Sequence, residues 1–227
     1  MSDPVVTAFL TKQLCANGGR LPKARVAHHL DLPQEQIEII LQEESLRFPM
    51  SGDVVIAQSP IRLCLKYKKG EEEQDDCGML HLCCSYLRGF CKKSTCKYSH
   101  DTQSKHNVTV LKANKVNGLN DEELKILLFQ NDHSLMPGVC VKYLHEKCDQ
   151  DKCNWLHMCG YFMRGECYRR TCYKSHNLLE ESTNLLIKSF GIPAVSVENF
   201  QMLAVLKNIQ LLQTQAFRPF GQAIERP

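Results

Sequence analysis

One spacing of cysteine and histidine occurs three times in this chain and constrains the fold more than any other feature. The spacing is Cys-x7-Cys-x4-Cys-x3-His. A lone Cys is often a small buried apolar residue, but that explanation does not yield three copies of one pattern. Three thiolates and one imidazole complete a tetrahedral Zn²⁺ shell, and catalytic zinc instead keeps a position open, so we interpret these sites as structural. The ligands are Cys83, Cys91, Cys96, His100, Cys140, Cys148, Cys153, His157, Cys159, Cys167, Cys172 and His176.

A fourth, incomplete copy precedes these three, and an offset of 76 residues relates the first pair of fingers to the second. The position that corresponds to Cys148 is Glu72, so the first finger has lost one thiol. Glu72 could supply a carboxylate ligand, Cys84 could compete for the same position, or the finger could be metal-free and held by packing. We expect zinc to be weakly bound or absent here. The ligands that remain are Cys64, Cys77 and His81.

Composition and charge narrow the class of protein. The chain has 227 residues, of which 43% are hydrophobic, and 13 cysteines. Its start lacks the basic and apolar regions of a secretory signal, and no apolar run reaches the roughly 18 residues of a membrane span. We therefore expect reduced, zinc-holding cysteines in the cytoplasm and no membrane partner. The formal charge of +3 falls to about zero once three sites bind zinc as thiolates, so global charge does not predict nucleic-acid binding.

The N-terminal segment 1–60 predicts a winged-helix-like module. Apolar periodicity indicates helices over 4–17, about 22–30 and from Pro33 onward, and Gly18-Gly19 ends the first. A turn at Ser51-Gly52-Asp53 before Val54-Val55-Ile56 indicates a β-hairpin. The third helix exposes many acidic residues, which phosphates would repel from a DNA groove. We therefore interpret the module as a packing or protein-contact unit.

The whole chain is expected to be mainly α-helical with small zinc-stabilised modules. Asn120 to Glu123 resembles a capping box that begins a helix with an apolar face, and further helices are expected before Gly191 and over 194–213. After the module at 1–60, the expected organisation is fingers 1 and 2 at 61–101, a helical linker at 102–138, fingers 3 and 4 at 139–177, C-terminal helices at 178–214 and a flexible tail at 215–227.

Several motifs together resemble the N-terminal RNA-binding region of the CCCH-type zinc-finger antiviral protein family. They are the paired fingers joined by His-x-Cys, Leu-Cys-Ala-x-Gly-Gly-Arg at 14–20, and Leu-Leu-Phe-Gln-Asn-Asp at 127–132. The resemblance covers residues 1–215, and the segment 191–201 is most similar to the family's shorter, antiviral-like branch. CCCH-finger members of the poly(ADP-ribose) polymerase family are similar too. The chain shows no polymerase or WWE domain, so the resemblance implies no ADP-ribosylation.

The resemblance implies single-stranded RNA binding with a CpG preference read by the second finger. By this resemblance, Lys97 and Tyr98 correspond to residues of the family's RNA-binding pocket. Two positions depart from the antiviral protein, because Cys84 replaces a Lys and Phe90 an Arg, and the loop between the second and third Cys is shorter. It also implies antiviral or RNA-decay defence, with RNA-decay or ubiquitin-ligase proteins as further partners.

The residues of the second finger support RNA binding independently of the resemblance. Residues 83–100 contain no Asp or Glu, and cations alternate with aromatic rings there. Cations suit phosphates and rings suit unstacked bases. For Tyr86 and Phe90, packing beside the zinc site is an equal alternative. The candidate contacts are Arg88, Lys92, Lys93, Lys97, Tyr86, Phe90 and Tyr98, with Arg169, Arg170 and Tyr173 of the fourth finger as a second surface.

Two other functions compete with RNA binding. One is a protein-interaction scaffold in which the acidic third helix recruits a partner. The other is an enzyme, which would need paired carboxylates or an open metal site. The acidic cluster at 71–76 has no catalytic spacing, so we expect neither catalysis nor a small-molecule substrate.

Overall fold

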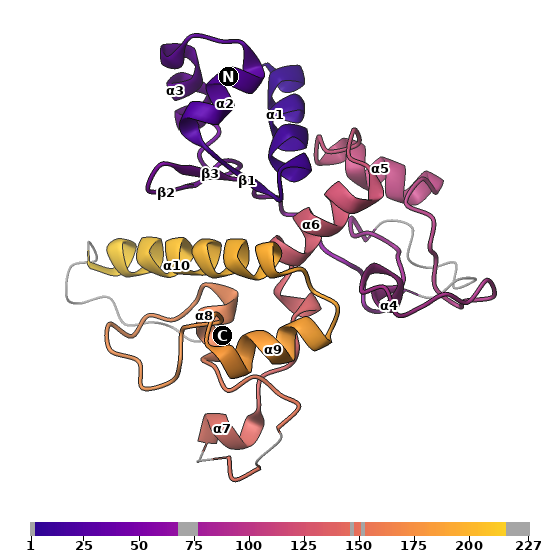
Figure 1. The fold of residues 1–227 in the computed structure, drawn as a ribbon, viewed down its shortest axis with the longest axis vertical. Helices are drawn as coiled ribbons and strands as arrows, with labels where there is room; N and C mark the ends of the chain where they lie inside the picture. The colour runs from indigo at the N-terminus through magenta and orange to yellow at the C-terminus, as the bar shows by residue number, and fades with distance from the viewer. Residues whose placement is uncertain (1–2, 68–76, 146–147, 151–152, 217–227) are drawn as a thin grey trace.

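A computed structural model describes residues 3–67, 77–145, 148–150 and 153–216, and its N-terminal module combines three helices with a small sheet (Figure 1). The sheet is antiparallel with strand order β1-β3-β2, and Arg20 of β1 pairs with Ile56 of β3. The elements are α1 (Pro4–Ala16), β1 (Arg20–Pro22), α2 (Lys23–Leu30), α3 (Gln34–Glu43), β2 (Met50–Ser51) and β3 (Val54–Ile56).

The boundaries of α1 follow from local chemistry. The Asp3 carboxylate accepts the Val5 N–H at 2.8 Å and caps the helix. Gly18 and Gly19 follow with φ of +82° and +88°, a region that glycine enters at little cost. The three helices and the hairpin lie where the sequence predicts them. Strand β1 was not predicted, because three residues are too few to show a period. The winged-helix interpretation stays a prediction.

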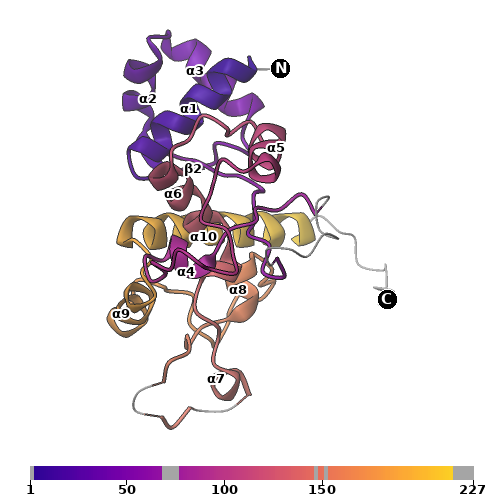
Figure 2. The ribbon, with the colours of Figure 1, turned by 90° about the vertical axis from the view of Figure 1, so that its right-hand side faces the viewer.

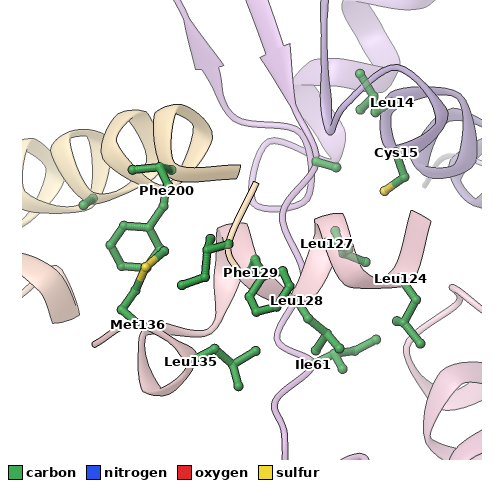
Figure 3. Packing of buried hydrophobic residues seen from close by; sticks show 14 of the residues in the cluster. Leu14, Cys15, Ile61, Leu124, Leu127, Leu128, Phe129, Leu135, Met136 and Phe200 are labelled. Carbon is green, nitrogen blue, oxygen red and sulfur yellow. The ribbon is translucent and has the colours of Figure 1, made fainter. Parts of the chain in front are cut away.

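Helix α6 (Asp121–Asn131) lies at the centre of the molecule and packs against both α1 and α10 (Ala194–Ala216). It begins with the capping box that the sequence predicts, with Asn120 and Glu123 bonded to each other's backbone N–H. Figure 3 shows its leucines between α1 and the chain around Ile61. Leu124, Leu127 and Leu128 are at most 2% exposed, so the predicted apolar face is the core of the fold.

Buried amides tie the N-terminal module to the C-terminal helix. The Asn199 side chain of α10 donates to Gln130 Oε1 at 2.8 Å, and Gln130 in turn donates to the Ala57 carbonyl at 2.6 Å. Arg20 donates to Asn199 and to the Glu198 carboxylate. Because buried polar groups are costly unless they are paired, this chain of bonds fixes how the ends of the sequence meet.

The two finger pairs lie on different sides of α6 and α10 (Figures 1 and 2). The short finger helices are α4 (Cys84–Leu87), α7 (Val141–His145) and α8 (Gly160–Arg164), and η2 (His133–Leu135) precedes the second pair. Helix α8 packs against α10, whereas α7 projects from the body in both views. Helix α5 (Lys105–Ala113), which follows the first pair, lies within the helical linker expected at 102–138, although its bounds were not predicted.

The C-terminal part agrees with the expected helices. Helix α9 (Glu181–Ser189) ends just before Gly191, and α10 continues to Ala216, two residues into the segment we expected to be a tail. The rest of that tail and the acidic cluster at 71–76 lie outside the described residues. The described helices include none that combines the length and apolar character needed to cross a bilayer. The chain is mainly helical with small Cys/His modules, as the sequence predicts.

Candidate metal centres and nucleic-acid interface

Four clusters of cysteine and histidine side chains converge in the structure, and their ligand atoms lie within 4.8 Å of one another in each. Three clusters are the complete sets predicted from the spacing. The fourth brings together Cys64, Cys77 and His81. All thirteen cysteines lie in the described part of the chain, and no disulfide joins any two of them. The sequence therefore predicted every side chain that these clusters contain.

The backbone holds the first ligand of each finger beside the last. In every finger the N–H of the first Cys donates to the carbonyl of the residue just before the ligand His. The duplication of the sequence is therefore also a duplication of backbone hydrogen bonds. These bonds are Cys64 to Leu80 (2.9 Å), Cys83 to Ser99 (2.7 Å), Cys140 to Leu156 (2.8 Å) and Cys159 to Ser175 (2.9 Å).

A stacked ring covers the ligand histidine of every finger. The ring always comes from the residue three positions after the first Cys, and in fingers 2, 3 and 4 that residue lies in the short finger helix. The centroid separations are 4.2 Å for Tyr67–His81, 4.3 Å for Tyr86–His100, 4.8 Å for Tyr143–His157 and 4.3 Å for Phe162–His176. We missed this role, although the 76-residue offset also relates these aromatic positions and could have revealed it.

The ligand histidines of the complete fingers have the chemistry that a metal requires. Nε2 of His100, His157 and His176 is buried and has no hydrogen-bond partner. A buried nitrogen without a partner is costly, but a metal ion satisfies it. Burial also lowers the pKa of His176, which favours the neutral imidazole that metals bind. The donor set therefore fits Zn²⁺.

The thiols of Cys83 and Cys159 need the metal in order to ionise. Burial raises the pKa of Cys83 and of Cys159 to about 11, so both are protonated thiols at neutral pH when no metal is bound. Backbone N–H groups oppose this shift, and the Phe162 N–H lies 3.4 Å from Cys159 Sγ. A coordinating cation deprotonates such thiols outright, so zinc binding releases protons and is favoured as pH rises.

The first finger holds its histidine by packing as well as by ligand geometry. His81 is 5% exposed, its Nε2 lies 3.1 Å from Cys77 Sγ, and His106 of α5 stacks on it at 3.8 Å. Glu72 lies outside the described residues. The sulfur of Cys84 is not among the ligand atoms that converge in this cluster, and burial raises the pKa of its thiol. The structure thus removes Cys84 from the candidate ligands of the first finger.

The candidate RNA contacts of the second finger divide into exposed and inward-facing groups. Lys92, Lys93 and Lys97 are exposed, Phe90 is 61% exposed, and Lys97 Nζ lies 5.3 Å from the centroid of the half-buried Tyr98 ring. Two others turn inward. Arg88 donates to the Leu135 carbonyl at 2.7 Å and lies over the Phe190 ring, and Tyr86 stacks on His100 as described above. Arg88 therefore anchors this finger to η2.

The fourth finger carries a hollow of about 390 Å³ that is lined by the ligand cysteines of the finger and by three tyrosines. Tyr161, Tyr168 and Tyr173 line it and are 57%, 56% and 74% exposed. Arg169 and Lys174 lie 5.5 and 5.1 Å from the Tyr173 ring centroid, within cation–π range. Arg170 is exposed beside them in sequence. Tyr161 was not among the predicted contacts, because helix α8 gave no sequence signal of which side chains it exposes.

Comparison with known proteins now identifies the family. A family model described as a PARP12-like CCCH zinc finger tandem matches residues 62–107, which contain fingers 1 and 2. The human zinc finger CCCH-type antiviral protein 1-like is 35% identical over an alignment that covers 93% of this chain and 82% of that relative. The chain belongs to the CCCH-type zinc finger antiviral protein family. It is accordingly a zinc-binding protein, and the Cys/His clusters are the groups of side chains that could hold the metal.

Longer relatives match this chain over only part of their own length. The mouse zinc finger CCCH-type antiviral protein 1 is 36% identical, and the alignment covers 88% of this chain but 23% of that protein. The human protein mono-ADP-ribosyltransferase PARP12 is 34% identical over 82% of this chain and 30% of its own length. The resemblance seen in the sequence thus includes the polymerase-related branch. Because the alignment covers only 30% of that relative, the transferase activity in its name is not assigned to this chain.

Proposed function

We propose that this chain is a non-enzymatic single-stranded RNA-binding protein that acts in antiviral defence through fingers 2 and 4. The observation that carries the proposal is that exposed aromatic side chains lie beside lysines and arginines, on backbone segments that the zinc ligands hold in place. Bases of a single strand stack on aromatic rings, and phosphates bind cations. The antiviral names of the relatives support the biological setting.

The fourth finger offers the more open of the two surfaces. Its three tyrosines line one hollow, and each exposes more than half of its surface. Such rings can accept bases of any identity, because every base has a π face. Arg169 and Lys174 above Tyr173 would neutralise the phosphates on either side of a stacked base.

The second finger offers a smaller surface with a fixed starting geometry. Lys97 and Tyr98 lie between the ligands Cys96 and His100, so two metal bonds restrain their backbone. This restraint lowers the entropy lost when RNA binds. The finger also presents Lys92, Lys93 and Phe90 to solvent. We propose that CpG selectivity, where this chain keeps it, is read here.

The cellular role that we propose follows the same reasoning. A protein whose thirteen cysteines form no disulfide fits a reducing compartment, so we propose that it acts in the cytoplasm. RNA bound by such a protein could be passed to RNA-decay or ubiquitin-ligase cofactors. No catalytic role is included, since each complete cluster supplies four protein ligands and thus a closed shell.

A protein-interaction scaffold remains the second candidate function. Its support is the N-terminal module, where Ile39 is 56% and Leu46 is 80% exposed beside an acidic helix. Exposed apolar residues that are rimmed by polar ones suit protein contacts.

Crosslinking of the zinc-loaded chain to a random single-stranded RNA pool tests the proposal. The readout is both the RNA sequence and the crosslinked residue. We expect crosslinks at Tyr98 and at the tyrosines of the fourth finger, with affinity that falls as salt rises. A chain that carries its zinc but binds no RNA in this assay contradicts the proposal and favours the scaffold.

A further inference from the structure

A second hollow, of about 140 Å³, lies where the fourth finger meets α10 and the start of the first finger. We call it the junction hollow. Met163, Phe200, Leu203 and Ala204 form apolar walls, and all four are at most 7% exposed. Its remaining side chains are polar or charged, and Gln130, Asn131 and His133 are among them. A charged group in a partly buried hollow is screened less than on open surface, so its interaction with a ligand is stronger there.

Three cations from separate parts of the chain line the junction hollow. They are Arg62, Arg164 of α8 and Lys207 of α10. The lining includes one carboxylate, Glu166, which bonds Arg164 Nε at 2.7 Å. The hollow therefore keeps an excess of positive charge, and an anion is the ligand whose charge complements it.

Lys207 is the cation that most needs a partner. Within the described chain its ammonium forms no hydrogen bond or ion pair, although the side chain is half-buried. Burial and the positive charge of Arg62 both lower its pKa. Ordinary surface lysines avoid such a position, since two like charges face each other in it. An anion bound between them would relieve the repulsion.

Local structure fixes these cations in place. Arg62 Nη1 donates to the carbonyls of Ser59 and Ile61 at 3.1 and 2.7 Å, which leaves other guanidinium donors for a ligand. The Lys207 stem lies against Gly165, where a Cβ would come within 2.8 Å of Lys207 Cβ. Gly165 also has φ of +76°, so both the close contact and the backbone conformation favour glycine at this position.

Arg164 connects the junction hollow with the tyrosine hollow of the fourth finger. Its guanidinium lies 5.0 Å from the centroid of Tyr161, which lines the tyrosine hollow, while Arg164 itself lines the junction hollow. Both residues belong to the short helix α8. A strand that placed a base among the tyrosines could therefore place a neighbouring phosphate at Lys207.

We propose that the junction hollow is a phosphate-binding site, and that its ligand in the RNA complex is a backbone phosphate next to a base on the fourth finger. The second half of this statement rests on the proposed RNA-binding function. Free phosphate and a nucleotide share the same chemistry, so the experiment separates these sources.

The experiment compares four zinc-loaded proteins: the parent, Lys207→Met, Lys207→Arg, and Lys188→Met as a control at an exposed lysine of α9. The first arm titrates inorganic phosphate against chloride at matched ionic strength and follows backbone amide shifts around Gly165. The second arm measures binding of a single-stranded RNA as a function of salt. Lys207→Met should melt no lower than the parent, since it removes a repulsive charge, so misfolding would not explain its losses.

We expect phosphate to shift these amides in the parent, the arginine variant and the control, and not in Lys207→Met. For RNA, Lys207→Met should reduce the slope of log K against log salt by about 0.7, the value for one phosphate on a single strand. Lys207→Arg and the control should keep the parent slope.

Each arm can fail separately. Equal phosphate shifts in the parent and Lys207→Met overturn the site itself. Phosphate shifts that need Lys207, together with an unchanged RNA slope, overturn the assignment of the ligand to RNA and point to a free phosphate compound. A parent that binds no RNA refutes the proposed function, while the phosphate arm still decides whether the hollow is a site.

Discussion

The first and third fingers occupy equivalent places in a duplicated pair, yet they are stabilised differently. Finger 3 has four ligands and projects from the body on α7, which has no buried residue. Finger 1 has three ligands in the described chain, and α5 supports it. His106 stacks on the ligand His81, and Asn107 bonds the His81 backbone N–H at 2.8 Å. The loss of one thiol is tolerated in finger 1 because contacts from α5 supply part of the stabilisation that a fully coordinated metal would supply.

The comparison is tested most strongly by removing one ligand from each finger. Cys153→Ala should release one zinc and unfold finger 3, because structural zinc contributes about 10–16 kcal/mol of apparent binding energy and no described helix packs on this finger as α5 packs on finger 1. Cys77→Ala should leave finger 1 mostly folded. Elemental analysis gives the zinc count, and amide hydrogen exchange at Leu156 and Leu80 reports folding. Equal loss of protection in both variants would show that α5 gives no support.

Restoring the missing thiol tests the same difference in the opposite direction. We expect the parent to retain three zinc ions against a competing chelator and Glu72→Cys to retain four, since the offset places this position at the missing ligand. Glu73→Cys is the matched control and should retain three. Four tightly held ions in the parent would mean that finger 1 already binds zinc with full strength.

The zinc ligands could be predicted from sequence because a closed shell depends on short, local spacing. Long-range packing is different. Nothing around Arg88 in the sequence shows that its guanidinium reaches Leu135, 47 residues away, instead of RNA. The junction hollow combines Arg62, Arg164 and Lys207, which only the packing of α8 and α10 brings together. The longer helices outside the fingers were predictable from caps and periodicity. The bounds of α5 were not, since its apolar face is short, and the finger helices α4, α7 and α8 were not predicted.

The fingers can also be compared as RNA surfaces. Tyr173→Ala should weaken single-stranded RNA binding by about 1–3 kcal/mol, as expected for loss of one stacked base. Tyr98→Ala should have a smaller effect, toward the low end of that range, because its ring is half-buried. Fluorescence anisotropy with one RNA measures both, and Tyr173→Phe, which keeps the ring, should bind as the parent does. A larger loss for Tyr98→Ala would make the second finger the main surface.

The smallest expected effect concerns the stacked rings, and it separates the two fingers once more. Aromatic pairs contribute about 0.5–1.5 kcal/mol beyond the area they bury. Tyr143→Leu removes the stacked ring of His157, whereas Tyr67→Leu leaves His106 on His81. The free energy of unfolding should therefore fall further for the first substitution.

Tyr143 has a second role that must be separated from stacking. Its hydroxyl accepts the Ser175 N–H at 3.1 Å and so links finger 3 to finger 4. Tyr143→Phe keeps the ring and removes this bond, at a cost of about 0.5–1.5 kcal/mol. The difference between the Leu and Phe variants at position 143 then measures what the ring itself contributes, which is its stack on His157 together with its contact with the Lys174 ammonium, 4.4 Å from the ring centroid. The same difference at position 67 should be smaller, because His106 remains stacked on His81. Chemical denaturation of the zinc-loaded proteins measures all four. If the two differences are equal, the His106 ring does not compensate for the lost stack in finger 1. The support from α5 must then come from its hydrogen bonds, which are those of Asn107 and the one between His106 Nε2 and the Met79 carbonyl at 2.8 Å.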